Sequence, residues 1–302
     1  HDERRDDMKG CFAPPVPMYS TGTAGRGKGY SSKGSASGKG GSGEVTASSP
    51  SPALLTANLK NSRTLEEVFC TVAAHEKRFN HIHLSACWSA LGNLANWANG
   101  LWVLEHAPVL NLLVQRTMHI ASTSSEIRAR ELANIAHGAA KSGQAGTMSA
   151  LMATLARSIE RRVADCNAQE LANVAWAFAK AAKPDTELFA VLARACEVQL
   201  SSFKAQELAN TAWGFATAGH TDTRLFAALA RAAEARLADF SVQGLSNTAW
   251  AFAKAGHDDA PLFRALAVAA RQRLPEFNAQ DLAHTAWAFA KAGALEAELA
   301  EA

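Results

Sequence analysis

The sequence lacks both the long hydrophobic runs of a membrane protein and the motifs of the common enzyme classes. No unbroken stretch of about 18 apolar residues occurs, so we expect no transmembrane helix and no membrane partner. The GxxxxGK[ST], GxSxG, HExxH and kinase-type patterns are all missing. We therefore predict a protein that is not an enzyme, has no catalytic residues, needs no cofactor and takes no small-molecule substrate.

Cysteine is scarce and scattered. The five cysteines form no CxxC pair, which argues against a zinc knuckle and against a secreted disulfide framework. The nearest approach to a metal cluster is His81-x-His83, which has no further ligands at a suitable spacing. We predict no metal site, and the cysteines suit a reducing compartment in which most of them are small buried hydrophobic residues.

The net charge of +2 is small and unevenly distributed. Residues 1–63 hold nine Lys and Arg against five Asp and Glu, whereas residues 64–302 hold 21 against 23. The body of the chain is therefore slightly acidic. Any contact with nucleic acid must depend on locally placed cations rather than on the field of the whole protein.

A Trp-centred phrase is repeated through the second half of the chain. It reads LANVAWAFAK, LANTAWGFAT, LSNTAWAFAK and LAHTAWAFAK, and its tryptophans follow one another at intervals of 37 residues: Trp176, Trp213, Trp250 and Trp287. A fixed period of this length is typical of stacked supersecondary units. We predict an all-α fold, a right-handed α-solenoid of helix-turn-helix repeats with a 37-residue period.

Each regular unit is expected to contain two helices, here called helix A and helix B. In the first unit helix A spans about 168–180 and helix B about 187–200. N-cap residues precede the A helices at Asn167, Ser241 and Asn278 and the B helices at Asp185, Asp222 and Asp259. Gly219, Gly256 and Gly293 stand where a left-handed residue ends a helix. No segment alternates with period two, so no strands are predicted.

Three segments follow from this pattern. Residues 1–52 form a Gly/Ser/Lys-rich tail that we expect to be disordered, or less simply a remnant of an organelle-targeting leader. Residues 53–163 form divergent helical repeats, with helices at about 81–95, 106–118 and 151–163 and with His137 in the place of the Trp. Residues 164–302 form the regular repeats, the last of them truncated, and we expect the chain to be a fragment of a longer protein.

One face of helix A carries a polar stripe that could form a binding groove. In the first unit the stripe consists of Gln169, Asn173 and Lys180, because positions seven apart differ by only about 20° around a helix axis. The equivalents are Gln206, Asn210 and Thr217, then Gln243, Asn247 and Lys254, and finally Gln280, His284 and Lys291. Stacking would align these stripes, and amides can bind base edges while Lys neutralises phosphates.

The stripe also has structural interpretations. The Asn position suits a groove contact and a buried amide ladder equally well, and at the Gln position a structural role is favoured. The Lys residues could contact phosphates or simply form a solvated face. The tryptophans are expected in the core, although aromatic side chains can also stack on bases.

The repeats from about Asn167 to Gly293 resemble the octotricopeptide repeat family of algal and protist organelles. Related helical-repeat proteins are the FAST-kinase-domain family, proteins with RAP domains, and a subunit of the kinetoplastid RNA-editing substrate-binding complex. This resemblance implies an α-solenoid that binds organellar RNA and controls its processing, stability or translation. It also implies a mitochondrial or chloroplast location and, as partners, single-stranded RNA and other subunits of an RNA-processing complex.

The residues and the resemblance together favour a non-catalytic solenoid that binds single-stranded RNA. The alternative hypothesis is a protein-interaction scaffold of the armadillo or tetratricopeptide kind, in which the Asn stripe grips a peptide backbone. The slightly acidic body of the chain supports that alternative.

Overall fold

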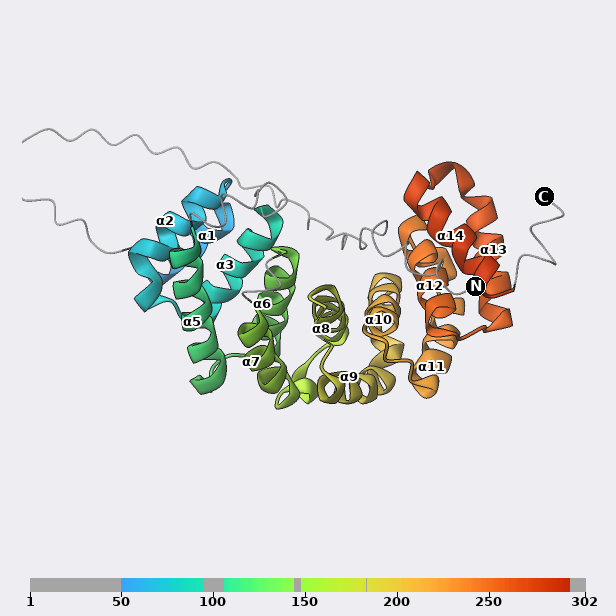
Figure 1. Cartoon of the computed structure of the whole chain (residues 1–302), viewed down its shortest axis with the longest axis horizontal. Helices are drawn as coiled ribbons and strands as arrows, with labels where there is room; N and C mark the ends of the chain where they lie inside the picture. The colour runs from blue at the N-terminus through green and yellow to red at the C-terminus, as the bar shows by residue number, and fades with distance from the viewer. Residues whose placement is uncertain (1–49, 95–105, 144–147, 183, 294–302) are drawn as a thin grey trace, which may run out of the picture. The chain divides into compact units, whose positions relative to one another are not determined.

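The computed structural model describes residues 50–94, 106–143, 148–182 and 184–293, and within these ranges every regular element is helical. All of the helices lie in Pro52–Ala302, the second of two units into which contacts divide the chain (Figure 1). The predicted tail over 1–52 falls outside the described residues except at its end, where Pro52 begins the first helix. The predicted all-α class is confirmed.

The helices alternate between two sets. The A helices are α1 (Pro52–Asn61), α3 (His81–Leu94), α6 (Ala129–Lys141), α8 (Ala168–Lys180), α10 (Ala205–Ala218), α12 (Val242–Ala255) and α14 (Ala279–Lys291). The B helices are α2 (Leu65–His75), α5 (Ala107–Thr123), α7 (Ser149–Glu160), α9 (Thr186–Gln199), α11 (Thr223–Glu234) and α13 (Ala260–Gln272). Most of the B helices are followed by a short 3-10 turn.

Each set forms its own row. α6, α8, α10, α12 and α14 pack on one another in sequence, and α5, α7, α9, α11 and α13 do the same (Figure 1). Because each A helix also contacts the B helix that follows it, one hydrophobic core continues from unit to unit. This pairwise packing is the architecture of a repeat solenoid, as the period predicts.

The predicted caps are present. The Asn167 side chain accepts a hydrogen bond from the Glu170 N–H, and the Glu170 carboxylate accepts one from the Asn167 N–H, which forms a capping box. The B helices α9, α11 and α13 begin at the predicted Asp N-caps. Gly219, Gly256 and Gly293 adopt φ values of 75°, 73° and 67°, the left-handed conformation that favours glycine.

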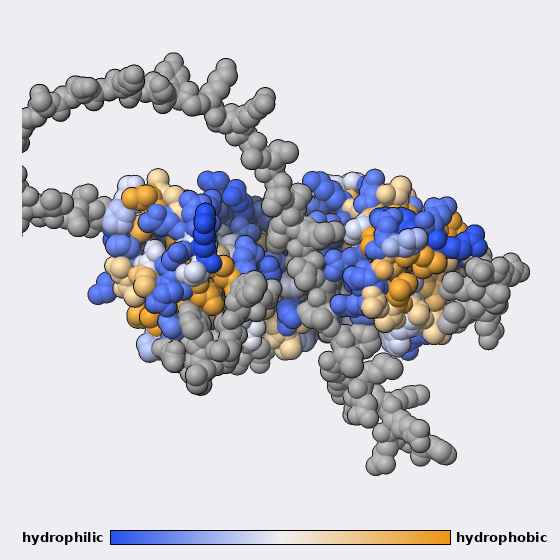
Figure 2. All heavy atoms as spheres, turned by 90° about the horizontal axis from the view of Figure 1, so that it is seen from above, coloured by the Kyte–Doolittle hydropathy of each residue, from blue (hydrophilic) through white to orange (hydrophobic). Residues whose placement is uncertain are grey.

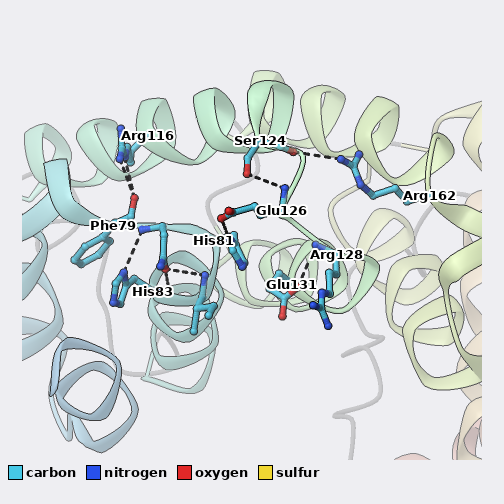
Figure 3. A network of polar contacts seen from close by, with 11 residues as sticks. Phe79, His81, His83, Arg116, Ser124, Glu126, Arg128, Glu131 and Arg162 are labelled. Carbon is cyan, nitrogen blue, oxygen red and sulfur yellow. Dashed lines mark hydrogen bonds and ion pairs between the residues drawn. The ribbon is translucent and has the colours of Figure 1, made fainter. Parts of the chain in front are cut away.

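A second repeated device joins the B helices, and sequence reasoning did not find it. At or just after the end of α7, α9, α11 and α13, a long side chain donates to a main-chain carbonyl of the preceding unit: Arg162 to Ser124, Gln199 to Cys166, Arg236 to Ser201, and Arg273 to Phe240. Figure 3 shows the Arg162 contact and a similar bond from Arg116 to the Phe79 carbonyl. Arg162, Gln199, Arg236 and Arg273 stand 37 positions apart, so this contact is part of the repeat.

The main departure from the predicted helix bounds is in α5. The sequence predicts a helix over 106–118, whereas α5 continues to Thr123 and has 17 residues. The hydroxyl groups of its last turn are hydrogen-bonded within the helix, since Ser122 Oγ and Thr123 Oγ1 donate to main-chain carbonyls one turn back. No helix among the described residues is long and apolar enough to cross a membrane.

Candidate nucleic-acid interface

The repeated tryptophans lie along the row of A helices as a ladder of rings. His137, Trp176, Trp213, Trp250 and Trp287 form this Trp ladder, and its successive ring centroids are 4.9, 6.2, 6.4 and 6.2 Å apart. Their planes are inclined by 25° to 37°, so Trp213 and Trp250 are stacked and the other neighbouring rings are tilted toward one another. Three of the tryptophans belong to the core, since Trp176, Trp213 and Trp250 are 2%, 6% and 8% exposed, whereas Trp287 is partly buried and packs against the core.

The Asn positions lie beside this ladder, three residues before each Trp. Asn173, Asn210, Asn247 and His284 are 7%, 8%, 5% and 4% exposed, and we call these four residues the amide row. The sequence leaves open whether they line a surface groove, and the structure places them almost out of contact with solvent. Close packing explains this burial, because a Cβ on Gly214 would lie 2.8 Å from the Ala175 carbonyl carbon of the neighbouring helix.

The three amides of the row lack partners within the described part of the chain. No hydrogen bond joins the side chains of Asn173, Asn210 or Asn247 to another described residue, so they do not form a bonded ladder. Four other polar atoms of the described A helices are fully buried and have no hydrogen-bond partner among the described residues: Trp176 Nε1, Thr211 Oγ1, Thr217 Oγ1 and Thr285 Oγ1. The amide atoms of the three asparagines are not among these fully buried atoms, so water or a ligand can still reach them and supply the hydrogen bonds that the chain does not.

The other stripe residues lie at the two ends of the helices. Gln169, Gln206 and Gln280 are exposed at the N-terminal ends, and Gln243 is half-buried. At the C-terminal ends Lys254 and Lys291 are exposed, whereas Lys180 and Thr217 are half-buried. The Gln, Asn, Trp and Lys positions therefore follow one another along each A helix at spacings of four, three and four residues, on one helix face.

The cations in this stripe differ in their surroundings. Lys254 Nζ lies 4.9 Å from the centroid of the Trp250 ring, so ammonium and indole form a cation–π pair. Partial burial lowers the pKa of the Lys180 ammonium. In the last unit burial lowers the pKa of His284, and the nearby Asp281 carboxylate opposes that shift. Lys254 therefore supplies positive charge beside an aromatic ring, which suits phosphate and base together, whereas burial favours the neutral form of His284.

The divergent units use the equivalent positions differently. Asn134, which corresponds to Asn173, donates from Nδ2 to Ser85 Oγ at 3.3 Å. Lys141, which corresponds to Lys180, donates from Nζ to Asn93 Oδ1 at 3.1 Å. The buried Trp88 likewise donates its indole N–H to Thr117 Oγ1 at 2.9 Å. In this region the polar groups of the A helices are satisfied inside the chain.

The ladder is the part of the site that sequence reasoning missed. The equal spacing of the tryptophans and the ring of His137 in the corresponding place were the available signals. Spacing alone could not show that the rings contact one another across units. No group of three or more His, Cys, Asp and Glu residues that could hold a metal ion occurs in the described ranges.

The fold and this interface define a helical-repeat protein with a row of polar and aromatic side chains along its A helices. The chain belongs to the family of the RNA-editing substrate-binding complex 6 protein, whose model matches residues 103–302, about two thirds of the sequence. The matched segment contains α5 to α14 and therefore the whole Trp ladder. No curated protein matches the chain significantly. The likeness to octotricopeptide repeats stays a prediction.

Proposed function

We propose that this protein is a non-catalytic subunit of an RNA-editing complex in the mitochondrion and that its A helices bind single-stranded RNA. Family membership supports the RNA-related, organellar role. The observation that carries the assignment to the A helices is the set of nearly buried amides without partners in the chain, at Asn173, Asn210 and Asn247. RNA bases offer these amides the hydrogen bonds that the protein does not.

The order of side chains along each helix supports the same assignment. In the third regular unit Asn247, Trp250 and Lys254 follow one another at spacings of three and four residues, which places them on one helix face. An amide can bind a base edge, an indole edge can contact a base, and a lysine can neutralise a phosphate. The 37-residue period repeats this set along the row.

The lysines provide the direct test. Three phosphate contacts on a single strand predict that log affinity falls with log salt concentration with a slope of about −2, since each contact adds about −0.7. Replacing Lys180, Lys254 and Lys291 with Ala should flatten this slope for a single-stranded polyuridine oligonucleotide. Replacing Arg194, Arg231 and Arg264 removes the same charge from exposed positions of the B helices and serves as the control.

A slope that is unchanged in the lysine variant but flattened in the arginine variant would place the RNA on the other row. The scaffold hypothesis makes a different prediction, because it expects no RNA crosslinks in the repeats. Crosslinking in cells followed by peptide mapping separates the two functions: adducts on α8 to α14 support RNA binding, and adducts confined to residues 1–52 support the scaffold.

A further inference from the structure

A pocket of about 520 Å³ lies between the C-terminal halves of α5 and α7, in the row of B helices. Three arginines line it, Arg157, Arg161 and Arg162, together with His119 and Gln115. Its hydroxyl groups come from Ser122, Thr123, Ser124, Ser125, Thr154 and Ser158. None of its lining residues is Asp or Glu, so the pocket is positively charged.

Two of the three arginines keep donors available for a ligand. Arg162 is held in place, since it donates to the Ser124 carbonyl at 3.2 Å (Figure 3). Arg161 makes one bond, from its guanidinium to Ser158 Oγ at 3.2 Å. Arg157 is exposed and has no hydrogen bond or ion pair with any described residue, although Glu160 interacts electrostatically with both Arg157 and Arg161 from outside the pocket. Because a guanidinium has five N–H donors, most of the donors of Arg157 and Arg161 are unused.

The hydroxyl groups of the pocket act as acceptors rather than donors. Ser122 Oγ donates its proton to the Met118 carbonyl, Thr123 Oγ1 to His119, and Thr154 Oγ1 to Ala150. Their oxygens retain lone pairs for a donor from outside. The pocket therefore combines charged donors for an anion with neutral acceptors for hydroxyl groups.

This pocket is not a product of the repeat. Arg157 recurs 37 and 74 residues later as Arg194 and Arg231, but the positions that match Arg161 hold Val198 and Ala235. The hydroxyl wall depends on the length of α5, which has 17 residues where α7, α9, α11 and α13 have between 12 and 14. No 3-10 turn separates α5 from α6, unlike the other described connections from a B helix to the next A helix.

We propose that this pocket binds a ribose-phosphate unit, either of a free nucleotide or of an RNA strand. The phosphate would be held by Arg157 and Arg161, in the bidentate geometry that guanidinium groups favour. The ribose hydroxyls would donate to the serine and threonine oxygens. A phosphorylated peptide has no ribose hydroxyls and would leave these oxygens unused. The volume suits a small ligand, since such sites measure about 300–1,000 Å³. This site goes beyond the proposed RNA-binding stripe, because it lies on the other row of helices.

The test measures binding of ribose 5-phosphate, adenosine 5′-monophosphate and inorganic phosphate to the full chain by calorimetry. We expect the Arg157→Gln/Arg161→Gln variant to lose at least tenfold in affinity for both ribose phosphates, since each charge-assisted hydrogen bond is worth about that much. The Arg194→Gln/Arg231→Gln variant carries the same charge change at exposed positions and should bind like the wild type. Equal losses in both variants, or no binding by the wild type, overturn the proposal. Inorganic phosphate bound as tightly as ribose 5-phosphate also overturns it.

The source of the ribose phosphate is decided with a polyuridine oligonucleotide. If the pocket variant also weakens binding of the oligonucleotide, the ligand is a unit of an RNA strand, and if it weakens only adenosine monophosphate the ligand is a free nucleotide. The Lys180, Lys254 and Lys291 variant should leave the affinity for adenosine monophosphate unchanged. The stripe and the pocket can therefore fail independently.

Discussion

The divergent and the regular A helices treat equivalent polar positions in opposite ways. In α3 and α6 the polar side chains bond to one another, as Asn134 does to Ser85 and Lys141 to Asn93. In α8, α10 and α12 the corresponding amides are nearly buried and have no partner among the described residues. The first arrangement stabilises the fold itself, whereas the second leaves hydrogen-bonding capacity for another molecule.

The close approach of neighbouring A helices is common to the two regions. Gly92 and Gly138 allow α3 and α6 into backbone contact, and a Cβ on Gly138 would lie 2.1 Å from the Trp88 carbonyl oxygen. Gly214 has the same role between α8 and α10, where a Cβ would lie 2.8 Å from the Ala175 carbonyl carbon. The two regions therefore share their helix packing and differ in the hydrogen bonds of their polar side chains.

The largest expected effect is a loss of stability on replacing Gly138 with Ala. The new methyl would collide with the main chain of Trp88, which cannot move as a flexible side chain could, so the free energy of unfolding should fall by about 3 kcal/mol. The control is Gly143→Ala, which has open space around it and costs only the strain of its positive φ, about 1 kcal/mol. Equal losses in urea denaturation would show that α3 and α6 are not in close contact.

A second prediction concerns pH and His137, the residue that begins the Trp ladder. Burial, aided by the charge of Lys141, lowers the pKa of His137 from 6.5 to about 4. The folded state therefore binds a proton on His137 more weakly than the unfolded state does. The free energy of unfolding has its full value from this group above about pH 6.5, and it falls by at most about 3 kcal/mol as the pH is lowered from there to about pH 4. In the His137→Phe variant this part of the pH dependence should disappear. A variant that loses as much stability as the wild type between about pH 7 and pH 4 would contradict the burial of this ring.

The smallest expected change in stability distinguishes an asparagine that is hydrogen-bonded within the fold from one that is not. Asn134→Ala breaks the bond to Ser85 and should lower the free energy of unfolding by about 1 kcal/mol. Asn210→Ala removes an amide that has no partner and should leave stability unchanged or slightly higher. Denaturation of the two variants side by side measures the difference. A larger loss from Asn210→Ala would show that this amide is bonded within the fold.

The repeat period was enough to predict most of the fold. Helix A of the first regular unit was predicted from 168 to 180 and observed at those residues, because its capping box and its apolar spacing agree. The length of α5 was not predictable from the period, since its hydroxyl residues continue the helix by local side-chain bonds. The burial of the amide row was also out of reach: it depends on how closely neighbouring A helices pack, which one helix sequence does not reveal.

The affinity of the Asn173→Ala/Asn210→Ala/Asn247→Ala variant for a polyuridine oligonucleotide tests the central claim most directly. If these three amides bind RNA, the variant should unfold at the same urea concentration as the wild type and bind the oligonucleotide at least tenfold more weakly. Undiminished binding by a folded variant would contradict the claim and would move the RNA away from this row.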